Sequence, residues 1–150
     1  AIRDGMYNPE EAVNQAQDLI ESGYDFSVLF VGDEDMGAAV IRMLKNKGLL
    51  NNPIKVISQN GSDAGIPLLE DGSLTYTIST SPGWEGMISF LALLSYVKGI
   101  NTEMKQQIML PMAVVTKENM NEEGVIVPWT SDPIWDDLTH KYFPEYDGLY

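Results

Sequence analysis

The chain has no cysteine and few basic residues, and both absences exclude classes of function. Without cysteine it forms no disulfide, no cysteine-ligated zinc site and no thiol nucleophile. Nine Lys and Arg residues stand against 22 Asp and Glu residues, and the formal net charge of −13 repels nucleic acid phosphates and anionic lipid headgroups. Nucleic acid is therefore not an expected partner.

Long apolar runs are also missing. No stretch approaches the roughly 20 apolar residues that a membrane-spanning helix needs. The first residues, AIRDGMYNPEE, lack the apolar centre of a secretion signal. If the protein is exported, we expect its signal to have been removed or to lie outside this sequence.

The sequence offers no motif for nucleotide binding, catalysis or metal binding. It has no GxGxxG pattern and no Walker-type loop that could hold a phosphate. His140, the only histidine, has no nearby serine or second histidine, so we expect it to be a surface residue. Asp33, Glu34 and Asp35 are consecutive and their side chains diverge, so a solvated helix start is favoured over a metal site. We predict no catalytic residue, no metal and no cofactor.

What the sequence does contain is an alternation of helix and strand signals. Asn8 is a good N-cap, because Pro9 occupies the first helical position and two glutamates follow in the first turn. Phe26–Val31 is almost entirely apolar, which is typical of a strand covered on both faces. The predicted elements, in chain order, are a helix from Pro9 to near Gly23, a strand at Phe26–Val31, a helix from Met36 to near Gly48, a strand at Ile54–Ile57, a short helix at Asp63–Glu70, a strand at Leu74–Thr80, a long helix from Trp84 to Gly99 and a strand at Ile108–Val115.

This alternation predicts an α/β fold, a three-layer αβα sandwich with a mainly parallel sheet. The regular pattern ends at about Lys117. The segment Asn119–Tyr150 contains three prolines and many aromatic residues. We expect it to pack irregularly on the surface, with a short helix at Pro133–Tyr142.

Polar residues follow two of the predicted strands. Gln59 and Asn60 come after the first, whereas Ser79, Thr80 and Ser81 end the second. The carboxyl ends of parallel strands lie at one edge of a sheet, where open α/β folds bind ligands. These residues are therefore candidates for a ligand-binding surface.

Three stretches carry a resemblance to a known family. SVLFVGDEDMGAAVIRMLKNKG at Ser27–Gly48 is similar to a strand, Asn-Asp-X-Met turn and helix of that family. The residues Ile54–Pro82 are similar to its strand, Asp-Gly turn, short helix and strand, and IMLPMAVVTKENM at Ile108–Met120 is similar to its last strand and Val-Thr-Lys-Glu-Asn ending. In their order and spacing they resemble the C-terminal half of type I periplasmic sugar-binding proteins, the ribose- and galactose-binding group that serves ABC importers.

The resemblance implies two α/β lobes joined by a hinge of three crossings, with a small ligand bound in the cleft between them. Residues 1–81 would form part of the C-terminal lobe, residues 82–115 would return to the N-terminal lobe, and residues 116–150 would form the third crossing and a C-terminal extension. The remaining parts of both lobes are not in the sequence, so the fold is expected to be incomplete and to leave apolar surfaces uncovered. We expect this chain to pair with the N-terminal half of the same protein or with a second copy of itself.

The resemblance also implies four ligand-binding residues: Tyr7, Asp33, Asn60 and Thr80. Tyr7 stands where the family often places an aromatic ring against the sugar, and Asp33 where Asn or Asp binds ring hydroxyls. Asn60 replaces the family's Asp, and Thr80 replaces a Gln or Asn, so neither ribose nor galactose can be assumed as the ligand. Other roles remain open: an N-cap for Asp33, a tight turn for Asn60, a hinge for Thr80 and a hydrophobic staple for Tyr7.

The function implied is that of a solute-binding component of an ABC importer, which binds a sugar or sugar-like polyol and works with a membrane permease. It would be periplasmic or extracellular, with or without a membrane anchor upstream, and it would not be an enzyme. One alternative is a ligand-sensing domain of the same fold in a transcription regulator or membrane receptor. Another, less favoured, is a flavodoxin-like enzyme or phospho-acceptor domain with magnesium at Asp33–Asp35.

Overall fold

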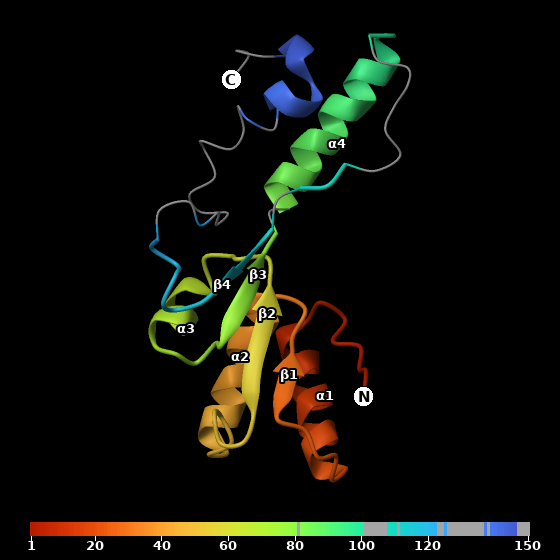
Figure 1. The fold of residues 1–150 in the computed structure, drawn as a ribbon. Helices are drawn as coiled ribbons and strands as arrows, with labels where there is room; N and C mark the ends of the chain where they lie inside the picture. The colour runs from red at the N-terminus through yellow and green to blue at the C-terminus, as the bar shows by residue number, and fades with distance from the viewer. Residues whose placement is uncertain are drawn as a thin grey trace.

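A four-stranded sheet in the order β1-β2-β3-β4 forms the centre of the fold (Figure 1). The computed structural model describes residues 1–80, 82–100, 108–110, 112–122, 125, 137 and 139–146. β1, β2 and β3 run parallel, and β4 runs antiparallel to β3. The predicted α/β class with a mainly parallel sheet is confirmed. The strands are β1 (Val28–Phe30), β2 (Lys55–Gln59), β3 (Tyr76–Ser79) and β4 (Ala113–Val115).

Side-chain caps determine where the first two helices begin. The side-chain oxygen of Asn8 accepts hydrogen bonds from the backbone N–H groups of Glu10 and Glu11 at 2.9 and 3.1 Å, which confirms the predicted cap. Asp33 caps the second helix. The helices are α1 (Pro9–Glu21), α2 (Glu34–Asn46), α3 (Ile66–Glu70), α4 (Pro82–Val97) and the 3-10 helix η2 (Pro144–Tyr146).

Several predicted elements are shorter in the structure, among them the strands that became β1 and β3. α3 begins at Ile66 because residues 63–65 form a turn, closed by a hydrogen bond from the Gly65 N–H to the Ser62 carbonyl at 2.9 Å. The last strand covers only β4, since residues 108–110 are not in a strand and position 111 lies outside the described residues. β3, with which β4 pairs, is itself only four residues long. The predicted helix at Pro133–Tyr142 is seen at residues 137 and 139–142, and its other positions lie outside the described residues.

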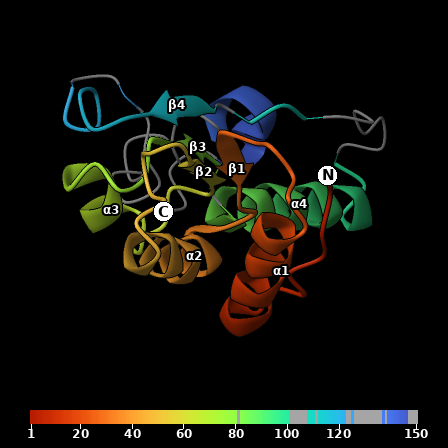
Figure 2. The same cartoon turned by 90° about the horizontal axis from the view of Figure 1, so that it is seen from below.

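α1 and α2 pack against each other and cover one face of the sheet, as Figures 1 and 2 show. The main core lies between them and the strands, and it includes Leu44, Val56, Leu69 and Val115, all 0% exposed. Burying one such side chain contributes about 1.5–3 kcal/mol to folding. This core fixes β1, β2 and β4 against the helices.

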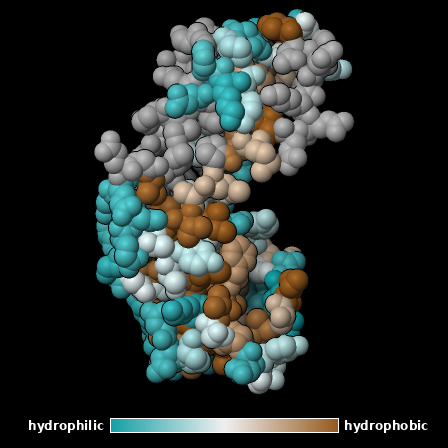
Figure 3. Space-filling model, viewed as in Figure 1, coloured by the Kyte–Doolittle hydropathy of each residue, from teal (hydrophilic) through white to brown (hydrophobic). Residues whose placement is uncertain are grey.

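The opposite face of the sheet remains exposed. Val28 and Phe30 alternate with the core-facing Leu29 and are 52% and 51% exposed, and Val114 on β4 is 54% exposed. Figure 3, in the view of Figure 1, shows apolar residues gathered over the sheet. The prediction that Phe26–Val31 is covered on both faces is therefore wrong, because among the described residues helices cover only one face of the sheet.

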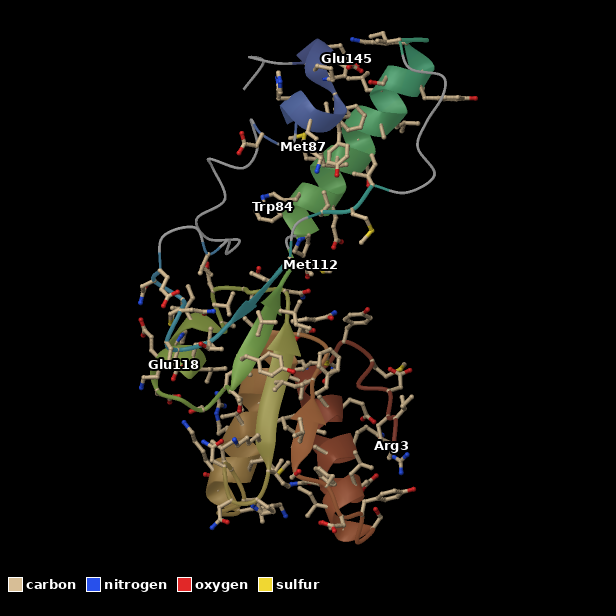
Figure 4. All side chains as sticks on the ribbon, viewed as in Figure 1. Arg3, Trp84, Met87, Met112, Glu118 and Glu145 are labelled. Atoms are coloured by element: carbon tan, nitrogen blue, oxygen red, sulfur yellow. The ribbon has the colours of Figure 1, made fainter. Side chains whose placement is uncertain are left out.

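A second apolar cluster lies on α4, which extends away from the sheet in Figure 1. The hydroxyl of Ser95 donates a hydrogen bond to Glu145 at 2.6 Å and so links α4 to the C-terminal segment (Figure 4). The predicted core position of Trp84 is confirmed, because it is 0% exposed. The buried members of the cluster are Trp84, Ile88, Leu91, Ala92, Phe143 and Tyr146. Other apolar residues of α4 are exposed, among them Phe90, Leu93, Tyr96 and Val97.

Candidate ligand-binding site

The predicted ligand residues Asp33, Asn60 and Thr80 follow three neighbouring strands at one edge of the sheet. β1 pairs with β2, and β2 pairs with β3, all in the parallel direction. The carboxyl ends of the three strands therefore lie together, as the sequence predicted for β2 and β3. Ligands bind at this edge in open α/β folds, because loops and helix starts converge there.

Asn60 and Thr80 are in direct contact. The Thr80 hydroxyl donates a hydrogen bond to the side-chain oxygen of Asn60 at 3.3 Å, and both residues are half-buried. Asn60 has a φ of +97°, and Gly61 after it has a φ of +66°. A non-glycine residue with such a positive φ carries about 1–3 kcal/mol of backbone strain, and such residues cluster at functional sites.

Asp33 acts as the N-cap of α2. Its Oδ1 accepts a hydrogen bond from the Met36 N–H at 2.8 Å, so the capping role is observed. A carboxylate has two oxygens and about four acceptor positions, so the cap leaves it able to accept hydrogen bonds from a ligand. Ligand contact by Asp33 stays a prediction.

Tyr7 lies in the turn before α1. Tyr7 is 90% exposed, so it does not pack as a hydrophobic staple. Both Met6 and Tyr7 have positive φ, in a turn closed by a hydrogen bond from the Asn8 N–H to the Gly5 carbonyl. Tyr7 lines a cavity of about 650 Å³ between the first seven residues, α1 and β1. Gln59 also lines this cavity, whereas Asp33, Asn60 and Thr80 do not.

The other polar residues at the strand ends divide between surface and interior. Ser79 is buried, and its hydroxyl oxygen accepts a hydrogen bond from the Ala113 N–H at 3.2 Å, so it joins β3 to β4. Gln59 is half-buried. Ser81 lies outside the described residues.

The prediction that the acidic run is a solvated helix start is wrong for Glu34, which is 0% exposed. Its carboxylate accepts hydrogen bonds from the Gly61 N–H at 2.8 Å, from the Ser62 N–H at 3.3 Å and from the Thr77 hydroxyl. The three donors provide the hydrogen bonds that a buried carboxylate requires. Asp35, by contrast, is exposed.

The sequence contained one signal for Glu34. It stands at the second position of the Asn-Asp-X-Met-like turn, where the pattern has an acidic residue, but its neighbours Asp33 and Asp35 hid it within a charged run. Only the structure shows that Glu34 is buried, whereas Asp35 is exposed. Within the described ranges, no group of three or more His, Asp or Glu residues could hold a metal ion.

Comparison with known proteins identifies the family. The sequence model of a family described as a periplasmic binding protein domain matches residues 1–101, and the chain belongs to this family. A comparison with curated proteins finds no match. Within the part of the chain that the structure describes, no helix has the length and apolar character needed to cross a membrane.

Solved structures of solute-binding proteins from ABC transporters share the fold. One from Agrobacterium vitis with bound D-fucose is 20% identical, with a TM-score of 0.70 over 82% of this chain and 41% of that one. One from Actinobacillus succinogenes with bound D-allose is 19% identical, with a TM-score of 0.64 over 76% and 39%. One from Bacillus halodurans with bound myo-inositol is 21% identical, with a TM-score of 0.63 over 76% and 38%. The chain thus spans about two fifths of the length of these proteins, and the resemblance drawn from the sequence is confirmed for family and fold.

Proposed function

We propose that the protein is the extracytoplasmic solute-binding component of an ABC importer, and that it binds a sugar or polyol without catalysing a reaction. The observation that carries the proposal is the contact between Asn60 and Thr80, which places polar groups of two adjacent strands on one surface. Structures of the same fold are described with D-fucose, D-allose and myo-inositol bound.

The side chains at this surface fit the chemistry of a sugar. A sugar ring presents hydroxyl groups around its edge and C–H groups on its faces, so it needs hydrogen-bonding groups and an aromatic ring. Asp33 offers acceptors, and Asn60 and Thr80 offer both donors and acceptors. Tyr7, which is 90% exposed, would offer its ring to a face of the sugar.

Binding in a cleft needs a second surface opposite the strand ends. We propose that residues 1–81 belong to one lobe, that residues 82–115 cross to the other, and that residues 116–150 form the third crossing and an extension. The exposed apolar residues of the sheet and of α4 support a partner that covers them, either the N-terminal half of the same protein or a second copy. The closed complex would deliver its ligand to a membrane permease.

Calorimetric titration tests this function. The protein, with any chain that co-purifies with it, is titrated with D-fucose, D-allose, D-ribose, D-galactose and myo-inositol. We expect saturable binding of at least one, weakened by about 1–3 kcal/mol in the Asn60→Ala variant if its amide is buried against the ligand. Asn14→Ala, which truncates an exposed asparagine of α1, is the matched control and should bind as the wild type does. No binding of any of the five compounds would refute the proposal.

A further inference from the structure

The buried carboxylate of Glu34 connects the three strand ends that carry the candidate ligand residues. Glu34 directly follows Asp33, and its oxygens accept hydrogen bonds from Gly61 and Ser62, which directly follow Asn60. It also accepts a hydrogen bond from Thr77 on β3, the strand that ends next to Thr80. One side chain therefore contacts all three segments of the site.

The groups hydrogen-bonded to the Glu34 carboxylate are all donors, so the carboxylate acts as an acceptor. Two backbone N–H groups and one hydroxyl donate hydrogen bonds to its two oxygens. Among the described residues the salt bridge is formed by Lys45 and Asp71, and Glu34 takes no part in it. A Cβ atom at position 65 would lie only 2.7 Å from the Cγ of Glu34, so glycine at that position leaves the room that this side chain occupies. The carboxylate is thus held by packing as well as by hydrogen bonds.

The turn that Glu34 holds is the one with the unusual backbone. Asn60 and Gly61 both have positive φ, and a non-glycine residue keeps such a conformation only where its surroundings fix it. The Asn60 N–H is bonded to the Ile78 carbonyl at 2.9 Å, and the next two N–H groups are bonded to Glu34. Without these bonds the turn would relax, and the Asn60 side chain would change direction.

We infer that Glu34 is a positioning residue, which fixes the turn at Asn60–Ser62 and thereby aims the Asn60 side chain at the ligand. This inference rests on the proposed function for its ligand, and on the structure alone for the turn. Glu34 itself is fully buried, so we expect it to act through the turn and not by contact with the ligand.

Glu34→Gln tests the inference, because glutamine keeps the size of the side chain but replaces one acceptor oxygen with an NH₂ donor. Ser58→Ala is the matched control: Ser58 is also 0% exposed and donates a hydrogen bond to the Val31 carbonyl at 2.9 Å, with no bond to the turn. Amide hydrogen exchange is measured by NMR in both variants, and the affinity for the five compounds named above is measured by calorimetry.

In Glu34→Gln we expect the Gly61 and Ser62 amides to exchange about tenfold faster, and the compound that the wild type binds to bind about tenfold more weakly. Ser58→Ala should leave both quantities within about twofold of the wild type, even if it lowers the unfolding temperature as much. A folded Glu34→Gln variant that keeps slow exchange at these amides, or loses no more affinity than Ser58→Ala, overturns the inference.

Thr77→Val keeps the test decisive if Glu34→Gln fails to fold. It removes one donor to Glu34 and keeps the shape of the β3 side chain, and we expect about threefold faster exchange at Gly61 and Ser62. Unchanged exchange in this variant overturns the inference. If the wild type binds none of the five compounds, the proposed function fails, and the amide exchange still decides whether Glu34 fixes the turn.

Discussion

The hydroxyl of Thr80 donates a hydrogen bond to the side-chain oxygen of Asn60, and so joins the ends of β2 and β3 across 3.3 Å. The two residues lie 20 positions apart in the sequence, and the parallel pairing of their strands brings them together. The contact lies at the edge of the sheet where an open α/β fold is expected to bind ligands.

Asn60→Gly should separate stability from binding. Glycine adopts positive φ without strain, so the variant is relieved of the backbone strain at position 60. This relief offsets the loss of the hydrogen bond from Thr80, which is worth about 1 kcal/mol. The free energy of unfolding should therefore equal or exceed that of the wild type. Sugar affinity should fall, because the amide is gone. Urea unfolding and calorimetric titration measure the two effects. Asn14→Gly, in the interior of α1, should instead cost about 0.3–0.5 kcal/mol of stability and leave affinity unchanged. Wild-type affinity in Asn60→Gly would contradict a ligand role for Asn60.

Gly65→Ala should destabilise the protein. The added Cβ would lie 2.7 Å from the Cγ of Glu34 and 3.3 Å from the Ser62 carbonyl oxygen, so the expected loss is about 1–3 kcal/mol in the free energy of unfolding. Gly86→Ala in α4 is the opposite case, because no atom lies within 4 Å of its added Cβ, and it should gain about 0.5–1 kcal/mol. Chemical unfolding of both variants checks the signs. Equal stability of the two variants would mean that Glu34 is not packed as the structure shows.

Asp71 should make a small contribution to the free energy of unfolding, and this contribution should be lost at low pH. Hydrogen bonding to Ser73, followed by the hydrogen bond to Lys45, lowers the pKa of Asp71 below its ordinary value. Its contribution is therefore complete above the pKa of an unfolded aspartate, about 3.9, and is lost as the pH falls through the lower folded value. Since both side chains are about half exposed, Asp71→Asn should cost only about 0.2–1 kcal/mol at pH 7.

Urea midpoints of the wild type and Asp71→Asn, measured from pH 7 down to pH 3, check this sign. The difference between the two proteins should shrink below about pH 4. Asp18→Asn, an exposed aspartate of α1, serves as the control. A difference that grows as the pH falls would contradict the assignment.

The uncovered face of the sheet should mediate association. Phe30 is 51% exposed beside Val28, and burial of these side chains by a partner would be favourable. In sedimentation velocity we expect a particle larger than 16.7 kDa, and Phe30→Asp should shift it towards the monomer. Tyr24→Asp, at an exposed aromatic in the loop after α1, should not. A wild-type monomer that stays soluble, with no co-purifying chain, would contradict the expected pairing.

Much of the fold follows from local sequence patterns. The Asn8 and Asp33 caps and the apolar runs before Asp33 and Asn60 suffice to place α1, α2, β1 and β2. The direction of a strand, and whether another layer packs on it, depend on distant parts of the chain. The antiparallel β4 and the exposure of Phe30 could therefore not be predicted from the sequence. An apolar strand has the same composition whether or not the layer over it is present.

The candidate site was predictable in part for the same reason. Parallel strands bring their carboxyl ends together, which placed Asn60 beside Thr80, but the burial of Glu34 depends on a turn 27 residues away. Nor does the sequence indicate that Tyr7 and Gln59 line one cavity, which Asn60 and Thr80 do not line. The ligand roles of all four residues stay predictions.

The most direct measurement follows side-chain amides by NMR while the ¹⁵N-labelled protein is titrated with whichever of the five compounds it binds. The account predicts saturable shifts of the Asn60 side-chain amide and the Thr80 backbone amide, with the Asn14 side-chain amide unmoved. Saturable shifts at Gln59 and Tyr7 alone would place the ligand in the cavity beside β1, and would contradict a binding site at the ends of β2 and β3.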